Sequence, residues 1–189
     1  MELLKKRIIE DGRVLPGQIL KVDAFLNHQI DVALLDEMGK EFQRLFPNKN
    51  ITRILTLEAS GIAVACSCGR AFGVPVVFAK KNRTKNLSGD LYRAQVLSYT
   101  TKKPYEIVVS QSFLNERDRI LIIDDFLAKG SAVFGMIDLV QQAKAELVGV
   151  GIAIEKGFQE GGKRLRKSGV VVESLAIIAS MSDEEIVFG

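Results

Sequence analysis

Residues 120–132 read ILIIDDFLAKGSA and carry the strongest functional signal in the chain. The apolar run Ile120–Ile123 predicts a strand that is covered on both faces of a sheet. Asp124 and Asp125 follow where this strand is expected to end. Buried acids are costly unless they have partners, and open α/β folds bind ligands at the carboxyl ends of their strands. We therefore expect Asp124 and Asp125 to be ligand-binding residues.

The segment after the two acids predicts a phosphate site. It consists of Ala128, Lys129, Gly130, Ser131 and Ala132, and a helical pattern up to residue 145 follows it. Small residues let backbone amides approach an anion, and a helix start favours negative charge. The carboxylates could in turn accept charge-assisted hydrogen bonds from the two hydroxyls of a ribose. The alternative is a strand and a turn with two solvated acids.

The apolar strand, the two acids and the small-residue loop resemble the phosphoribosyl-diphosphate signature of the type I phosphoribosyltransferases. The resemblance implies an α/β fold with a central, mostly parallel sheet flanked by helices, a small base-binding cap (hood) and a hairpin flap. It also implies that Asp124 and Asp125 are the catalytic acids and hold the ribose, while residues 128–132 bind phosphoribosyl diphosphate. Some relatives carry an acid where this chain has Ala128, so the general base stays unassigned. Lys129 could contact phosphate or point into solvent.

Strand-like and helical segments alternate along the chain. Strands are expected at residues 54–57, 74–79, 119–123 and 147–154, and helices at 62–72 and 132–145. This alternation is typical of a doubly wound parallel sheet. Residues 95–99 and 106–109 are also strand-like and flank the turn-prone Thr101–Pro104, which predicts an antiparallel hairpin that projects from the sheet.

The two ends of the chain are expected to form the cap. The first fifty residues contain a short helix, a strand-like segment at 18–22 and an amphipathic helix at about 32–46, and residues 170–177 and 185–188 are strand-like. The chain shows no repeat and no linker, so we expect residues 1–189 to form a single domain. The cap would comprise about 1–50 and the C-terminal strands, the core about 51–155, and the flap about 87–109.

A second turn of small residues follows the first core strand. Residues 56–61 read TLEASG, in which Ser60 and Gly61 open the next helix. Amides and a hydroxyl at a helix start can bind an anion, although such a turn is more often a plain helix cap. The segment resembles the pyrophosphate loop of the family. Lys80 and Lys81 resemble its basic motif, which grips the pyrophosphate, commonly that of the neighbouring subunit. The resemblance therefore implies that Lys81 binds phosphoribosyl diphosphate and that the protein is a homodimer; the alternative is a solvated basic loop.

The hairpin at about 87–109 resembles the flexible flap of the family in its position. Displacement of pyrophosphate passes through a ribosyl cation of oxocarbenium character, which water would quench, so the reaction needs a lid. An Mg²⁺ ion bound mainly through the substrate diphosphate would neutralise the leaving group together with the basic residues. No residue of the chain is assigned as a metal ligand. A surface hairpin without a function is the alternative.

Residues 18–31, QILKVDAFLNHQID, closely resemble the amino-terminal segment of bacterial phosphoribosyltransferases that act on xanthine. The resemblance covers the whole chain, including residues 151–159, GIAIEKGFQ. In that group the residues matching Leu20, Asn27 and Lys156 bind the base. Xanthine has a carbonyl at C2, where guanine has an amine, and an amide donor with a cation would favour the carbonyl. Without the resemblance, Asn27 is interpreted as a turn residue and Lys156 as an exposed lysine at a strand end.

Composition predicts a globular protein of the cytoplasm. The chain has 189 residues, of which 47% are hydrophobic and 26% charged. No apolar stretch approaches a membrane span, and the charged start has no signal-peptide pattern. A net charge of +3 is too small to indicate nucleic-acid binding. Cys66 and Cys68 cannot close a four-ligand zinc site and are expected to be buried helix thiols.

The sequence therefore predicts an enzyme of purine salvage. It would transfer the phosphoribosyl group from phosphoribosyl diphosphate to xanthine, with Mg²⁺, giving xanthosine monophosphate and pyrophosphate. A guanine or hypoxanthine transferase is the nearest alternative. A regulator that senses phosphoribosyl diphosphate is another, but such regulators usually carry an added DNA-binding domain, and the chain shows no clear helix-turn-helix.

Overall fold

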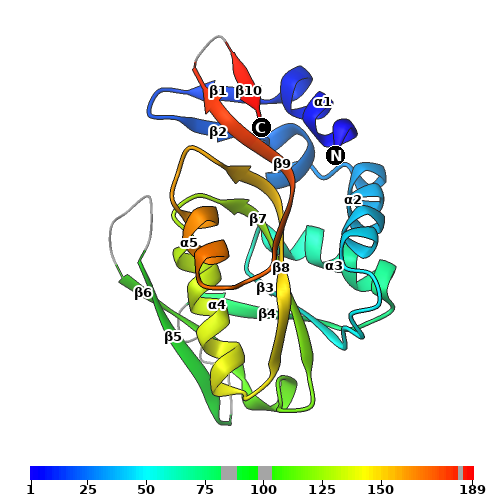
Figure 1. Ribbon diagram of the computed structural model, residues 1–189, viewed down its shortest axis with the longest axis vertical. Helices are drawn as coiled ribbons and strands as arrows, with labels where there is room; N and C mark the ends of the chain where they lie inside the picture. Colours follow the sequence, from blue (N-terminus) through cyan, green and yellow to red (C-terminus); the bar gives the residue numbers. More distant parts are fainter. Residues whose placement is uncertain (82–88, 98–103, 183–184) are drawn as a thin grey trace.

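The computed structural model describes residues 1–81, 89–97, 104–182 and 185–189 (Figure 1). Its α-helices are α1 (Glu2–Asp11), α2 (Val32–Leu45), α3 (Gly61–Phe72), α4 (Ser131–Gln142) and α5 (Gly161–Lys167). Its strands are β1 (Arg13–Leu15), β2 (Ile19–Lys21), β3 (Arg53–Leu57), β4 (Val76–Lys81), β5 (Leu91–Leu97), β6 (Pro104–Ser110), β7 (Arg119–Leu127), β8 (Glu146–Lys156), β9 (Val172–Met181) and β10 (Ile186–Phe188). A short π-helix, Asp23–Asn27, and a 3₁₀ turn, Gln111–Phe113, complete the described elements.

The described residues form one large sheet of eight strands in the order β10-β9-β8-β7-β3-β4-β6-β5. The five central strands, β9, β8, β7, β3 and β4, pair in parallel. The strands at both edges pair antiparallel, β10 with β9 at one side and the β5–β6 hairpin with β4 at the other. Long apolar runs suit the centre, because parallel strands are covered on both faces. The expected α/β fold with a mostly parallel sheet is therefore confirmed.

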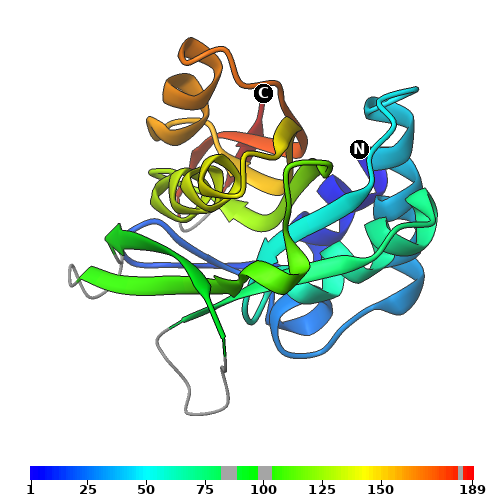
Figure 2. The same cartoon turned by 90° about the horizontal axis from the view of Figure 1, so that it is seen from below.

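Helices cover the two faces of this sheet. Figure 2 shows α4 and α5 on one side and α2 and α3 on the other. Phe42 of α2 and Val64 of α3 belong to one buried apolar cluster, and Met136 of α4 and Leu165 of α5 belong to a second. The strands contribute side chains to both clusters, because successive residues of a strand point to opposite faces. Leu121 of β7 belongs to the first cluster, and its neighbours Ile120 and Ile122 belong to the second. The sheet is thus the middle layer of three.

The chain ends pack together beside the carboxyl ends of the central strands (Figure 1). The amino group of Met1 donates to the carbonyl of Leu175 in β9 at 2.5 Å, and Leu4 and Ile8 of α1 are fully buried. The small β1–β2 sheet lies in the same region, and Lys156 Nζ at the end of β8 donates to the carbonyl of Gln18 at 2.8 Å. Residues far apart in sequence therefore meet over the end of β8.

Two details of the sequence prediction are wrong. The strand expected at 119–123 continues through both acids to Leu127, because its pairing with β8 continues as far as Leu127 and Glu155. Asp124 and Asp125 thus lie within the strand and not after it. The predicted antiparallel hairpin is present, but it extends the edge of the sheet instead of projecting from it, since β6 pairs with both β4 and β5. Residues 98–103, including most of its predicted turn, lie outside the described residues.

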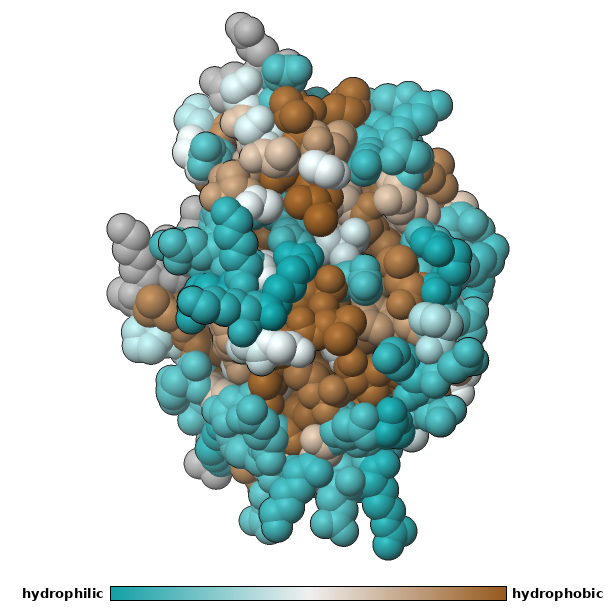
Figure 3. All heavy atoms as spheres, in the orientation of Figure 1, coloured by the Kyte–Doolittle hydropathy of each residue, from teal (hydrophilic) through white to brown (hydrophobic). Residues whose placement is uncertain are grey.

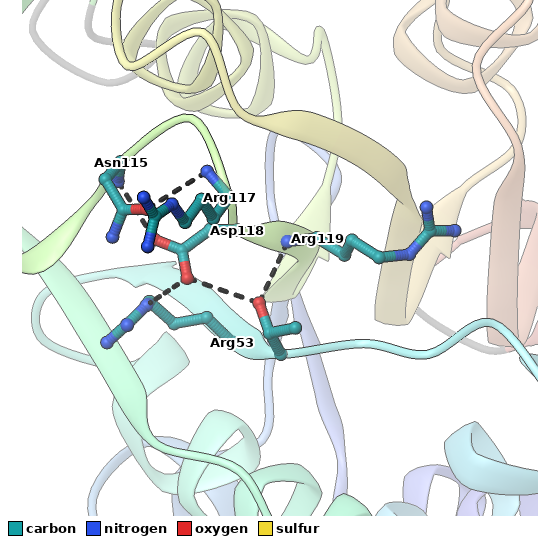
Figure 4. Close-up of polar contacts among 6 residues, drawn as sticks. Arg53, Asn115, Arg117, Asp118 and Arg119 are labelled. Carbon is teal, nitrogen blue, oxygen red and sulfur yellow. Dashed lines mark hydrogen bonds and ion pairs between the residues drawn. The ribbon is translucent and has the colours of Figure 1, made fainter.

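Asp118 fixes the opposite end of the sheet, at the start of β7 (Figure 4). Its buried carboxylate accepts hydrogen bonds from Arg53 Nε at 3.1 Å, from Thr52 Oγ1 at 3.2 Å and from the Asn115 N–H at 2.9 Å. The Arg119 N–H donates to the same Thr52 hydroxyl at 2.9 Å. Because the buried charge is paired and hydrogen-bonded, it ties β3 to β7 far from the acid pair.

Candidate active site

Asp124 and Asp125 lie where β7 loses one neighbour. Within the described chain, β3 pairs with β7 only as far as Ile122, whereas β8 stays paired to Leu127. Both carboxylates are nevertheless buried, with 6% and 7% of the residue exposed. Asp124 Oδ1 accepts a hydrogen bond from the Asp125 N–H at 3.0 Å. Both acids therefore lie past the last residue pair of β3 and β7, where β7 keeps only its pairing with β8.

The environment of Asp124 disfavours its ionisation. Burial, followed by the charge and the hydrogen-bonding carboxyl of Asp125, raises the pKa of Asp124 well above its usual range. The Asp125 N–H and the positive charge of Lys81 act in the opposite direction. Hydroxyl donors or additional cations at this position would offset this effect, because both favour a carboxylate.

The loop from Ala128 to Ala132 connects the end of β7 to α4. Gly130 has φ +83°, in the left-handed region that favours glycine, and its carbonyl accepts the Phe134 N–H at 2.9 Å. α4 begins at Ser131 directly after this turn. The first amides of a helix have no intrahelical partner, and the helix dipole favours an anion there. The loop therefore has a glycine turn followed by a helix start, the two features on which the predicted phosphate site rests.

The turn after β3 lies against the acids. A Cβ atom at Gly61 would overlap Thr56 Oγ1 and would lie 3.1 Å from Asp124 Oδ1, so only glycine lets the start of α3 approach this closely. Glu58 accepts the Lys81 N–H at 2.6 Å, which ties the turn to the end of β4. The half-buried Ser60 makes no side-chain cap to α3 in the described structure. The turn after β3 thus lies beside Asp124 and the end of β4, and the Ser60 hydroxyl is not used as a cap.

A cavity of about 330 Å³ opens between the loop after β7 and the hood. The predicted residues on its wall are Ala128, Lys129, Gly130, Ser131 and Ala132 from the loop and Leu20, Asn27 and Lys156 from the hood and β8. Asn27 is exposed at the end of the π-helix, whereas Leu20 is buried. Residues 20, 27 and 156 therefore share one cavity with the phosphate-type loop.

Lys156 is not the exposed strand-end lysine that its position alone suggests. Only 8% of the residue is exposed, and Nζ donates to the Gln18 carbonyl at 2.8 Å. Burial lowers the pKa of Lys156, because a charged ammonium is poorly solvated there. Nζ therefore lies on the cavity wall as a donor that a ligand carbonyl could engage.

The acid pair and Lys81 do not line this cavity but meet it at Tyr105. Tyr105, from β6, is part of the cavity wall, and Lys81 Nζ lies 5.9 Å from the centre of its ring. Burial, followed by the nearby charge of Asp124, raises the pKa of Tyr105. Tyr105 thus lies between the cavity on one side and Asp124 and Lys81 on the other.

Sequence reasoning missed several residues of this surface. Val96, Leu97 and Tyr105 from the hairpin and Phe126 from β7 line the cavity. The alternating pattern of the hairpin predicted strands but not that α4 and the loop before it would lie beside them. The cysteine prediction is wrong in part: Cys68 is buried, which raises the pKa of its thiol, whereas Cys66 is exposed.

Comparison with known proteins identifies the family. A model of the phosphoribosyl transferase domain matches residues 21–188. The chain belongs to the phosphoribosyltransferase family. A protein of Ruminiclostridium cellulolyticum named xanthine phosphoribosyltransferase is 58% identical over 188 residues, covering 100% of this chain and 99% of the relative. One of the same name from Clostridium novyi is 56% identical with the same coverage.

Solved structures agree with this fold. An adenine phosphoribosyltransferase from Trypanosoma brucei has a TM-score of 0.80 at 20% identity, covering 96% of this chain and 82% of that one. One from Giardia lamblia has a TM-score of 0.77 at 20% identity, covering 92% and 96%. At such identity these structures support the fold alone. No helix in the described part of this phosphoribosyltransferase is long and apolar enough to cross a membrane.

Proposed function

We propose that the protein transfers the phosphoribosyl group from phosphoribosyl diphosphate to xanthine, forming xanthosine 5′-monophosphate and releasing pyrophosphate. The observation that carries the proposal is the cavity of about 330 Å³, in which Leu20, Asn27 and Lys156 face a phosphate-type loop. Full-length relatives named xanthine phosphoribosyltransferase at 58% and 56% identity support the choice of base. The reaction is therefore a glycosyl transfer of purine salvage.

The phosphoribosyl diphosphate would lie along the carboxyl end of the sheet. Residues 128–132 would bind the 5′-phosphate through backbone amides, and Ser60, Gly61 and Lys81 would contact the pyrophosphate. The ribose hydroxyls would donate to Asp124 and Asp125, whose burial makes such charge-assisted bonds strong. Those donors would also relieve the unfavourable ionisation of Asp124.

A magnesium ion would enter with the substrate. Within the described ranges, no three His, Cys, Asp or Glu side chains gather in a metal-holding group. Mg²⁺ usually keeps several waters and binds through one or two carboxylates plus substrate phosphates, and the Asp124–Asp125 pair fits that limited role. The ion would neutralise the leaving pyrophosphate, while the residues of the chain orient the ribose and exclude water.

The base would be selected at C2. Asn27 supplies an amide and Lys156 an ammonium on the wall of the cavity, and both can donate to the C2 carbonyl of xanthine. Guanine has an amine at this position, so the donors of Asn27 and Lys156 would face another donor and make no hydrogen bond. Leu20, which is buried, would pack against the purine ring.

The assembly proposed is a homodimer of single-domain subunits in the cytoplasm. Phe78 and Phe113 remain 41% and 57% exposed and border an apolar cavity of about 310 Å³ that Lys80 also lines. A second copy that covered this surface would bring a neighbouring site close to Lys80 and Lys81. Residues 1–50 and the last strands would act as the hood, and the hairpin at 87–109 as the flap.

Turnover of the purified protein tests the reaction. Xanthine, phosphoribosyl diphosphate and Mg²⁺ should yield xanthosine monophosphate, identified by mass spectrometry, with one pyrophosphate per product. The matched control is the variant in which both Asp124 and Asp125 are replaced by Asn, which keeps the shape and removes the charge. Binding of phosphoribosyl diphosphate without turnover of any purine would refute the proposed enzymatic activity and would favour a regulator that senses phosphoribosyl diphosphate.

A further inference from the structure

Glu155 is a buried carboxylate next to the base-side lysine. Only 3% of the residue is exposed, and it accepts hydrogen bonds from Arg166 Nη1 at 2.7 Å, Arg166 Nη2 at 2.8 Å and Ser174 Oγ at 2.5 Å. Burial alone would raise the pKa of Glu155, but the hydrogen bonds from Arg166 and Ser174 and the charge of Arg166 together lower it. The carboxylate is therefore ionised at neutral pH and paired in a two-pronged geometry.

This ion pair attaches α5 to the end of β8. Arg166 lies on α5, and a Cβ atom at Gly162 would overlap the Glu155 carboxylate and lie 2.6 Å from Arg166 Nη1. Arg164 of the same helix lies over the ring of Phe134 in α4, 4.8 Å from its centre. The short helix is thus held by one ion pair, in which Glu155 is buried and Arg166 is partly exposed, and by one cation–π contact.

The first residue of α5 contacts the phosphate-type loop. The Gly161 N–H donates to the Ala128 carbonyl at 3.0 Å. A Cβ atom at Gly161 would overlap that carbonyl oxygen and lie 2.8 Å from the Gly130 nitrogen. The helix and the loop therefore pack backbone against backbone, and a shift of α5 would displace the loop.

We propose that Glu155 and Arg166 are positioning residues: through α5 and Gly161 they hold the phosphate-type loop at a fixed distance from Lys156. Glu155 and Lys156 are adjacent on β8, so their side chains leave opposite faces of the strand. Lys156 lines the base-side cavity, while Glu155 fixes the helix that supports the loop. One strand end therefore sets the spacing of the two halves of the site. The inference rests on the proposed function.

The test compares Arg166→Ala and Gly161→Ala with Lys167→Ala. Lys167 is an exposed residue on the same helix, and the outer side of α5 is hydrophilic (Figure 3). The first two variants should raise the KM for phosphoribosyl diphosphate and lower kcat/KM by up to about 100-fold, the loss of rate expected when a positioned group moves by about 1 Å. Arg166→Lys should restore little, because an ammonium cannot make the two parallel bonds. Lys167→Ala should keep the wild-type KM.

The kinetic readout separates positioning from stability. Assays are made well below each melting temperature, with the folded fraction measured by circular dichroism. An unchanged KM in Arg166→Ala and Gly161→Ala, with activity lost only in proportion to unfolded protein, would overturn the inference. Should Arg166→Ala not fold, Glu155→Gln decides, because it keeps the shape of the side chain and removes only the charge that pairs with Arg166. If the wild type turns over no purine, the proposed function fails, and calorimetric binding of phosphoribosyl diphosphate replaces KM as the readout.

Discussion

Replacing Asp124 by Asn should stabilise the ligand-free protein while weakening its binding of phosphoribosyl diphosphate. Asp124 is buried beside Asp125, and burial followed by the charge of Asp125 raises the pKa of Asp124 well above its usual range. Asn has nearly the same shape and carries no charge, so Asp124→Asn removes this cost. A site that stabilises its ligand is expected to be strained without it.

The sign of the pH dependence follows from proton linkage. The native pKa of Asp124 lies above the unfolded value of about 3.9, so between the two values the folded protein binds more protons than the unfolded chain. The free energy of unfolding therefore falls as the pH rises through this window, by about 1.4 kcal/mol for each pH unit between the two pKa values. Asp124→Asn should gain most over the wild type at the alkaline side of the window and least below it.

The assay is calorimetric unfolding at pH values from 4 to 8, with exposed Asp90→Asn as the matched control. Each charge-assisted bond to the ribose is worth on the order of 1.5–3 kcal/mol, or about 10- to 150-fold in affinity. Added phosphoribosyl diphosphate and Mg²⁺ should therefore raise the melting temperature of Asp124→Asn much less than that of the wild type. Equal pH slopes for the two ligand-free proteins, or equal shifts with ligand, would refute the reasoning.

Three further outcomes are expected. Asn27→Ala and Lys156→Ala should lower the ratio of kcat/KM for xanthine to kcat/KM for guanine, because each lost donor costs roughly 1–3 kcal/mol with xanthine and less with guanine. An equal loss of kcat/KM on both bases in steady-state assays would contradict the role of these residues in base selection. Asp118→Ala should lower the free energy of unfolding by on the order of 3 kcal/mol in urea titration, because Arg53 loses its buried partner. The KM for phosphoribosyl diphosphate should stay unchanged. A smaller loss of stability than in Asp90→Asn would argue against a structural role for Asp118. Light scattering should give a dimer mass at assay concentration, and a fully active monomer would exclude a shared site.

The fold was predictable because its central strands are continuous apolar runs. Ile120–Ile123 is such a run, and it indicated a parallel strand without any knowledge of its partners. The position of the acids within that strand was less predictable, because Phe126 and Leu127 continue the pairing with β8 after two charged residues. Local sequence describes the strand, whereas the neighbouring strand determines its length.

Many of the candidate site residues could be predicted from sequence motifs, whereas the others are brought to the site by contacts between segments that are distant in sequence. Asp124, Asp125 and residues 128–132 belong to one sequence segment, so their proximity could be inferred directly. Tyr105 reaches the cavity only because the hairpin extends the sheet edge beside α4. The polar segment that forms α5 gives no local indication that Arg166 pairs with the buried Glu155 of β8. Tertiary contacts of this kind leave no local signal in a single sequence.

A competition between purines shows directly which base the enzyme uses. The wild-type protein is given equal, subsaturating concentrations of xanthine, guanine and hypoxanthine with phosphoribosyl diphosphate and Mg²⁺, and the nucleotide products are quantified by mass spectrometry. Under these conditions the initial product ratio equals the ratio of kcat/KM values. We expect xanthosine monophosphate to be the main product. A dominant guanine or hypoxanthine nucleotide would contradict the assignment of Asn27 and Lys156 to xanthine, and the absence of all three products would contradict the enzyme itself.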